Sequence, residues 1–332
     1  MTASPLAGPL LQSFFTDHLL NHKCVSPQTV HAYRDTFRLL LNYIRDEARI
    51  APSDLQLPQI GADRILSFLD NLEQKRGNCA RSRNARLAAI RSFFRFVALR
   101  EPGCVALATQ VLAIPAKRAN RRLVGYLTRA EIEAMLAVPD LSCWGGRRDH
   151  VLLLTLYNTG ARVSEIATMR RSQFQCGSGS FICLKGKGRK ERTVPVWNKT
   201  ARALQNWFNE IHDIPGDLAF PSARGAMLSR HGVTYILDRI VQRAAVHCPN
   251  LKSKSVSPHV IRHSTAMHLL QSGVDTSVIA LWLGHESAET THIYVEADLA
   301  TKERALENLA PPGSKSRRFR ADDALIGFLA SL

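Results

Sequence analysis

Helical periodicity runs through almost the whole chain, and it constrains the fold more than any other feature of these 332 residues. Within residues 5–101, apolar side chains recur three and four positions apart, as in the stripe from Val30 to Ile44. Ser26 and Pro27 supply an N-cap and a first-turn proline for the helix that carries this stripe. Residues 5–101 are therefore predicted to form a domain of four helices.

The pattern weakens over residues 102–126, which hold Pro102-Gly103 and a run of basic residues. This composition predicts a basic linker between two domains. Thr128, with Glu131 three positions later, is a capping-box signature for a new helix. A second domain is therefore expected over residues 127–310.

One pair of β-type runs interrupts the helices of the second domain. Phe181–Lys185 and Thr193–Trp197 are rich in β-branched and aromatic residues, and a glycine-rich basic stretch separates them. The sequence therefore predicts a mainly α fold with one small β-hairpin, whose tip is cationic. Residues 311–332 are expected to add a basic tether and a short apolar helix.

The charge balance favours a polyanionic partner. The chain has 44 Lys+Arg against 28 Asp+Glu, a formal net charge of +16, and phosphate neutralisation dominates nucleic-acid affinity. A basic protein without such a partner, or arginines that merely face solvent, would have the same composition. As a group, the basic residues of the first domain, the linker and the hairpin tip predict a surface that contacts DNA. They are Arg34, Arg38, Arg81, Arg83, Arg86, Arg91, Lys117, Arg118, Arg121, Arg122, Arg189 and Lys190.

The sequence also indicates a compartment. It has no run of 18 apolar residues, and its N-terminus lacks the positive region of a signal peptide. Its seven cysteines form no C-x-x-C pair, which favours reduced thiols over disulfides or a metal site. A cytoplasmic, nucleoid-associated bacterial protein without a membrane segment or metal site is predicted.

Six polar residues in the second half of the chain suggest a reaction. A phosphodiester resists attack until its charge is neutralised, and guanidinium groups bind phosphate oxygens in a bidentate manner. A tyrosine, whose ordinary pKa is about 10, can attack because nearby cations favour its phenolate form and a histidine can accept its proton. A lysine can protonate the leaving hydroxyl, and a covalent phosphotyrosine conserves the bond energy without a cofactor. The six residues are Arg162, Lys187, His259, Arg262, His285 and Tyr294.

Residues 150–310 resemble the catalytic domain of the tyrosine recombinase (phage integrase) family, and its Xer-type members in particular. TGARVSEIATMR is similar to the segment of the first family arginine, GKGRKERTVPV to the hairpin with the lysine, HVIRH to the His-x-x-Arg box, and LGH to the penultimate histidine segment. The amino half resembles the helical core-binding (SAM-like) domain of the family. The resemblance implies a two-domain, C-shaped clamp around DNA.

The resemblance also implies a role for each residue. Arg162 and Arg262 would hold the scissile phosphate, His285 would donate a hydrogen bond to it, and Glu165 would support Arg162. Tyr294 would then form the 3′-phosphotyrosine.

Proton transfer would fall to two further residues. Lys187 would act as the general acid, and His259 would assist proton transfer from the tyrosine.

The partners implied by the resemblance are double-stranded DNA with an inverted-repeat core site and further recombinase protomers. A tetramer on synapsed DNA is expected, either of this chain alone or with a related recombinase. Residues 299–309 or 323–332 would pass from one protomer to the next. An accessory DNA-bending or directionality protein is a further expected partner, in mobile-element transposition or in Xer-like resolution.

Two other functions remain open at the level of the sequence. A type IB topoisomerase uses a similar set of arginine, lysine, histidine and tyrosine residues to relax supercoils. A non-catalytic DNA-binding relative would keep the fold without the reaction.

Overall fold

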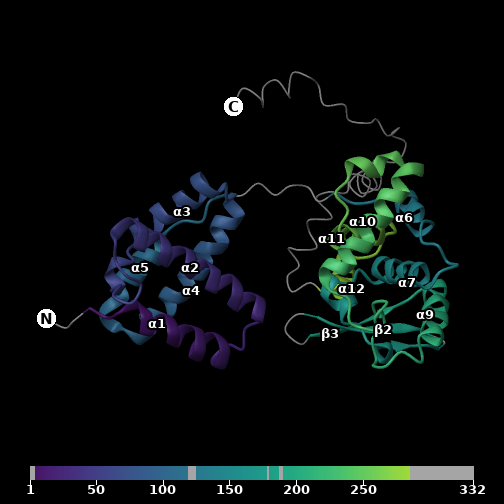
Figure 1. Cartoon of the computed structure of the whole chain (residues 1–332), viewed down its shortest axis with the longest axis horizontal. Helices are drawn as coiled ribbons and strands as arrows, with labels where there is room; N and C mark the ends of the chain where they lie inside the picture. The colour runs from purple at the N-terminus through teal and green to yellow at the C-terminus, as the bar shows by residue number, and fades with distance from the viewer. Residues whose placement is uncertain (1–3, 119–124, 178, 187–189, 285–332) are drawn as a thin grey trace, which may run out of the picture. The chain divides into compact units, whose positions relative to one another are not determined.

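The computed structural model describes residues 4–118, 125–177, 179–186 and 190–284 (Figure 1). The chain divides into two compact units, Met1–Arg121 and Arg122–Leu332. Both are built mainly of helices, and the second also contains a small sheet, as the sequence predicts. None of the described helices is both long and apolar enough to cross a bilayer.

The helices of the first unit surround an aromatic core. Ser26 caps the second helix by accepting a hydrogen bond from the Thr29 N–H. Phe14 and Phe37 lie edge-on to Phe93, with ring centroids 5.5 and 5.3 Å away. The helical elements are α1 (Ala7–Ser13), a π-helix (Phe14–His22), α2 (Pro27–Ala48), α3 (Ala62–Arg76), α4 (Ala80–Arg100) and α5 (Val105–Ala113), with 3₁₀ turns at Leu57–Gln59 and Pro102–Cys104.

Residues 102–114, assigned to the linker from the sequence, belong instead to the first unit. They form a 3₁₀ turn and helix α5, which contacts α3 and α4. Ala108, Val111 and Ile114 recur three residues apart and are buried in the core of this unit. Pro102 and Gly103 therefore turn the chain without ending the domain.

The second unit packs helices around a three-stranded antiparallel sheet. The strand order is β1-β2-β3, and Cys183 pairs with Thr193. The predicted strand at Phe181–Lys185 is confirmed, whereas its partner begins two residues earlier than predicted. The elements are α6 (Arg129–Leu136), α7 (Trp144–Thr159), α8 (Val163–Ala167), β1 (Phe174–Gln175), β2 (Phe181–Lys185), β3 (Glu191–Pro195), α9 (Asn198–Glu210), α10 (Arg230–His247), α11 (Pro258–Gln271) and α12 (Thr276–Leu283), with 3₁₀ turns at Arg171–Gln173 and Pro249–Ser253.

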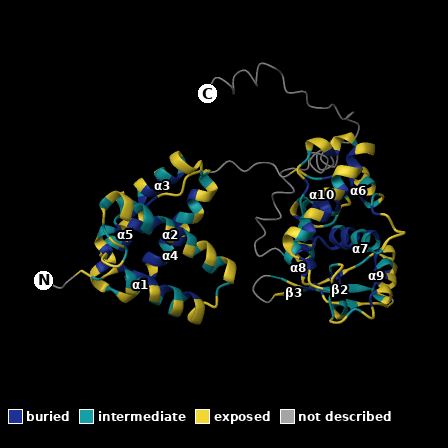
Figure 2. Ribbon diagram, in the orientation of Figure 1, coloured by how far each residue is buried: buried dark blue, intermediate teal, exposed yellow. Residues whose placement is uncertain are grey.

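Helix α7 lies at the centre of the second unit, and its C-terminal half from Val151 is almost entirely buried (Figure 2). It contacts both α9 and α11. Ile182, Leu184 and Val194 bury one face of the sheet in the same core. Helix α7 ends at Gly160, in a left-handed conformation with φ 58°. The chain then enters α8 at Arg162.

Candidate active site

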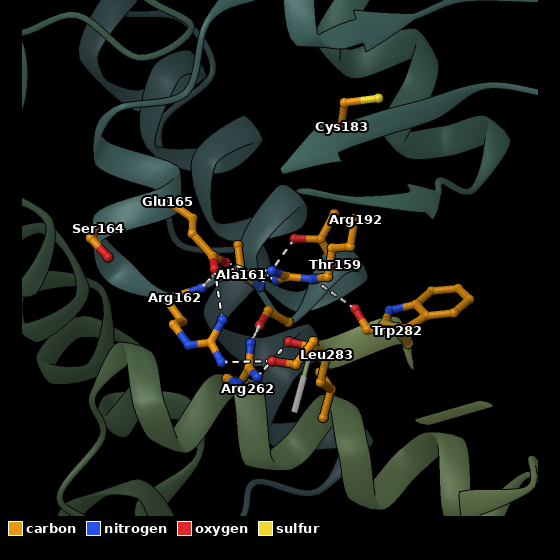
Figure 3. A network of polar contacts seen from close by, with 12 residues as sticks. Thr159, Ala161, Arg162, Ser164, Glu165, Cys183, Arg192, Arg262, Trp282 and Leu283 are labelled. Atoms are coloured by element: carbon orange, nitrogen blue, oxygen red, sulfur yellow. Dashed lines mark hydrogen bonds and ion pairs between the residues drawn. The ribbon is translucent and has the colours of Figure 1, made fainter. Parts of the chain in front are cut away.

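Three segments far apart in the sequence meet beside α11: the start of α8, strand β3 and the end of α12 (Figure 3). Arg162 occupies the N-cap position of α8. Its Nη1 donates to Oε1 of Glu165 at 2.8 Å, and its Nη2 donates to the carbonyl of Gly284 at 2.9 Å. The side chain of Arg162 is 32% exposed. Its guanidinium is thus fixed on two sides, and the side chain is partly open to solvent.

Arg262 lies on α11 and is almost fully buried, with 3% exposed. Its Nη1 donates to the carbonyl of Gly160 at 2.7 Å, and its Nη2 donates to the carbonyl of Leu283 at 2.6 Å. These carbonyls belong to the ends of α7 and α12, where a helix carries partial negative charge. Two helix ends therefore orient Arg262.

Arg192 is a third arginine of this cluster, and it was not expected from the sequence. Its Nη1 and Nη2 donate to the two oxygens of Glu165 at 2.9 and 2.8 Å, and its Nε donates to the carbonyl of Trp282 at 2.9 Å. It shares the inward face of β3 with Val194. An arginine at an inward-facing strand position is a signal for a buried polar site. The strand predicted from the sequence begins at Thr193, so it does not include Arg192.

Glu165 is the shared acceptor of this cluster, and its side chain is 2% exposed. Besides Arg192, it accepts from the N–H and Nη1 of Arg162, both at 2.8 Å. Burial raises the pKa of Glu165, but hydrogen bonds and charge from Arg192 and then Arg162 outweigh burial, so its pKa lies below the ordinary value. With Arg262 included, the cluster contains three guanidiniums and one carboxylate. The cluster is positively charged and suited to an anion.

Two histidines in the first turns of α11 lie beside these arginines. The rings of His259 and His263 are 4.9 Å apart between centroids. Desolvation lowers the pKa of His259, and the charges of Arg262 and Arg162 act in the same direction. Burial, followed by the charges of His259 and Arg262, lowers the pKa of His263 to about 4. His259 is therefore neutral near pH 7 and able to accept a proton.

Two glycines bring the neighbours of predicted catalytic residues to this cluster. A Cβ on Gly186 would lie 3.2 Å from Oε1 of Glu165, and Lys187 is the next residue. Gly284, whose carbonyl accepts from Arg162, directly precedes His285. Lys187, His285 and Tyr294 themselves lie outside the described residues.

Several of the basic residues predicted to contact DNA are exposed. Arg34 and Arg38 have side chains 58% and 70% exposed and flank Asp35. The other described residues of this kind that are exposed are Arg81, Lys117, Arg118 and Lys190. Arg121, Arg122 and Arg189 lie outside the described residues.

Lys117 and the remaining basic residues of the predicted DNA surface make contacts within the first unit. Arg83 is 3% exposed, and its Nε lies 3.6 Å from Oε2 of Glu73. Lys117, with 48% of its side chain exposed, contacts the same carboxylate at 2.5 Å. Burial beside Glu73 removes Arg83 from the surface that the sequence predicts.

Two further arginines of this group join elements of the first unit. Arg86 donates from Nη1 to Oγ1 of Thr36 at 3.0 Å, which joins α4 to α2. Arg91 donates to the carbonyl of Ile114 just after α5. Within the described residues, no group of three or more His, Cys, Asp or Glu side chains is placed to hold a metal ion.

Comparisons with known proteins cover both units. The phage integrase family profile matches residues 125–300, and the profile of the phage integrase N-terminal SAM-like domain matches residues 13–101. The integrase/recombinase y4rC of Sinorhizobium fredii is 49% identical over 332 residues, which is 100% of each chain. The tyrosine recombinase XerD of Pseudomonas aeruginosa is 34% identical over 297 residues, which is 88% of this chain and 93% of that protein.

Solved structures share the fold at lower identity. The XerH recombinase bound to its palindromic difH substrate, in a post-cleavage complex, aligns with a TM-score of 0.66 at 22% identity, over 84% of this chain and 79% of that chain. The Tn1549 transposon integrase in complex with circular intermediate DNA aligns with a TM-score of 0.68 at 15% identity, over 91% of this chain and 99% of that chain.

Proposed function

The chain belongs to the phage integrase family of tyrosine recombinases, and we propose that it cleaves and rejoins DNA at a specific site through a 3′-phosphotyrosine on Tyr294 and a Holliday junction. The proposal rests on how the guanidinium of Arg162 is held in the structure. Glu165 and the carbonyl of Gly284 hold it, yet its side chain is 32% exposed. An oriented, charged side chain that is partly open to solvent suits a scissile phosphate.

Arg162 and Arg262 bind the phosphate in this proposal, and the excess positive charge around them stabilises the charge that develops at phosphorus. Preorganised donors of this kind are each worth about 10²–10³ in rate. His285, which follows Gly284, donates a hydrogen bond to a phosphate oxygen.

Neutral His259 assists removal of the proton from Tyr294, because its lowered pKa leaves the ring unprotonated near pH 7. Lys187, which follows Gly186 beside Glu165, protonates the 5′-hydroxyl that leaves. The free 5′-hydroxyl of a partner strand later attacks the phosphotyrosine and restores a phosphodiester.

The DNA partner in this proposal is a duplex with an inverted-repeat core site. The net charge of +16 supports a phosphate-rich partner. Arg34, Arg38 and Arg81 present exposed cations on α2 and α4, and Lys190 does so beside the hairpin tip. We expect these residues to contact the DNA backbone in the bacterial nucleoid.

The active assembly in this proposal is a tetramer on two synapsed sites, of this chain alone or with a related recombinase. A groove of about 460 Å³ in the second unit, lined by apolar residues such as Leu136, Leu269 and Trp282 and by charged ones such as Arg129, is the acceptor that we propose for a segment of a neighbouring copy. Residues 299–309 or 323–332 of a neighbouring copy would fill it. A chain that ends at Pro312 retains only the first segment, so unchanged tetramer assembly by that variant would exclude the second.

Mobile-element integration or transposition is the role we propose, with Xer-like resolution as the alternative. The full-length likeness to the integrase/recombinase y4rC of Sinorhizobium fredii supports this choice. An accessory DNA-bending or directionality protein would then set the direction of the reaction.

A suicide-substrate trap tests the proposal. Nicked duplexes made from DNA that flanks the gene would be incubated with the protein, and peptide mapping would locate any covalent adduct. We expect an adduct at Tyr294 on one defined sequence, and none with Tyr294→Phe, which should bind the DNA normally. An adduct on any duplex would instead indicate a topoisomerase, and residual cleavage by Tyr294→Phe would refute the nucleophile.

A further inference from the structure

Arg192 is a largely buried arginine of the site that was not expected from the sequence. Its side chain is 10% exposed, and each of its three nitrogens donates a hydrogen bond within the protein. These hydrogen bonds connect Arg192 to Glu165 and to the end of α12. Its effect on the reaction must pass through the groups that it holds.

The first of these groups is Glu165. Without Arg192, this buried carboxylate would pair with Arg162 alone, and the positive charge of Arg162 would be cancelled locally. With Arg192 bonded to both carboxylate oxygens at 2.9 and 2.8 Å, the three side chains carry a net positive charge. Arg192 therefore leaves the charge of Arg162 available to an anion.

The second group is the end of α12. The Nε of Arg192 donates to the carbonyl of Trp282, two residues before Gly284. A Cβ built on Gly284 would lie 3.0 Å from Cδ of Arg192. Arg192 thus fixes the backbone whose Leu283 carbonyl orients Arg262 and whose Gly284 carbonyl orients Arg162.

We propose that Arg192 is a positioning residue for strand cleavage: it joins Glu165 to the end of α12, and so holds Arg162 and Arg262 together as one phosphate-binding pair. This inference rests on the proposed recombinase function. Because a shift of about 1 Å in a catalytic group costs about 10²-fold in rate, loss of Arg192 should slow cleavage at saturating protein while DNA affinity changes little.

The experiment compares single-turnover adduct formation, DNA affinity and unfolding for the parent protein, four test variants and one control variant. Arg192→Met removes every contact, and Arg192→Lys keeps the charge without the fork. Glu165→Gln and the double variant Glu165→Gln/Arg192→Met complete a double-mutant cycle.

Arg171→Met is the matched control. Arg171 lies in the same unit with 21% of its side chain exposed, and it donates to the carbonyl of Ile211 at 2.8 Å, outside the arginine cluster. Its loss removes a half-buried arginine without touching Glu165 or α12. A merely structural effect of arginine removal would appear in both Arg171→Met and Arg192→Met.

We expect Arg192→Met to cleave about 10²-fold more slowly at saturation, with a DNA dissociation constant within about threefold of the parent. Arg192→Lys should recover part of the rate, and the double variant should be no slower than the slower single variant, because residues that act as a unit are not additive. Arg171→Met should cleave within about threefold of the parent rate.

Several results would overturn the proposal. Equal slowing in Arg171→Met and Arg192→Met would mean a general loss of stability. Multiplied losses in the double variant would mean that Arg192 does not act through Glu165. A loss of affinity alone would make Arg192 a DNA ligand. Cleavage by Arg192→Met at the parent rate would refute the positioning role only, whereas no adduct from the parent protein would refute the proposed function itself.

Discussion

Replacement of Gly160 by alanine would test how closely the helix ends approach at the site. Gly160 has φ 58°, and a Cβ there would lie 2.5 Å from Cδ2 of Leu283. The left-handed conformation costs an alanine about 1–2 kcal/mol. Overlap with Leu283 adds about 1–3 kcal/mol, because the end of α12 must shift. Gly273 is the control, since it has φ 84° and no heavy atom within 4 Å of a Cβ.

Tryptophan fluorescence in urea would measure these costs in the second unit alone, because all four tryptophans lie there: Trp144, Trp197, Trp207 and Trp282. Gly160→Ala should lose about 1–3 kcal/mol more unfolding free energy than Gly273→Ala. It should also slow adduct formation, since the carbonyls of Gly160 and Leu283 both orient Arg262. Equal losses of stability in Gly160→Ala and Gly273→Ala, together with cleavage by Gly160→Ala at the parent rate, would refute the close packing of the ends of α7 and α12.

Three further predictions use the same assays. Lys187→Ala should slow adduct formation strongly and regain rate on a 5′-bridging phosphorothiolate substrate, whose leaving group needs no proton; a rate that stays low would exclude Lys187 as the acid. The pKa of His263 is lowered from 6.5 to about 4. The contribution of its uncharged ring to the unfolding free energy is therefore present above pH 6.5 and is lost as the pH falls to 4, by up to about 3 kcal/mol. Unfolding followed by tryptophan fluorescence should depend less on pH in His263→Asn than in the parent protein. Nζ of Lys254 lies 2.7 Å from Oε2 of Glu131, whose side chain is 3% exposed. Lys254→Met should therefore lower the unfolding free energy by about 3–5 kcal/mol, measured by tryptophan fluorescence in urea. The double variant Lys254→Met/Glu131→Gln should regain part of that loss.

Elements with strong local signals could be predicted from the sequence. The glycine that ends α7, the strand Phe181–Lys185 and the capping box of Thr128 and Glu131 all appear in the structure, because each has a strong signal in residues that are close together in the sequence. Helix α5 was missed because proline and glycine at its start resemble a linker, and its burial depends on α3 and α4. Helix propensity is a local property and cannot predict a tertiary contact of that kind.

The groups that orient the arginines of the site could not be predicted from the sequence. A buried guanidinium needs acceptors in a fixed fork, and here backbone carbonyls of Gly160, Trp282, Leu283 and Gly284 supply most of them. Every residue has a carbonyl, so no side-chain pattern marks these positions. What marks them indirectly is the pair of left-handed glycines, since a helix that stops at glycine exposes its last carbonyls. Gly160 and Gly284 therefore belong to the site as much as the arginines do, because a side chain at either would displace the carbonyls that hold Arg162 and Arg262 in place.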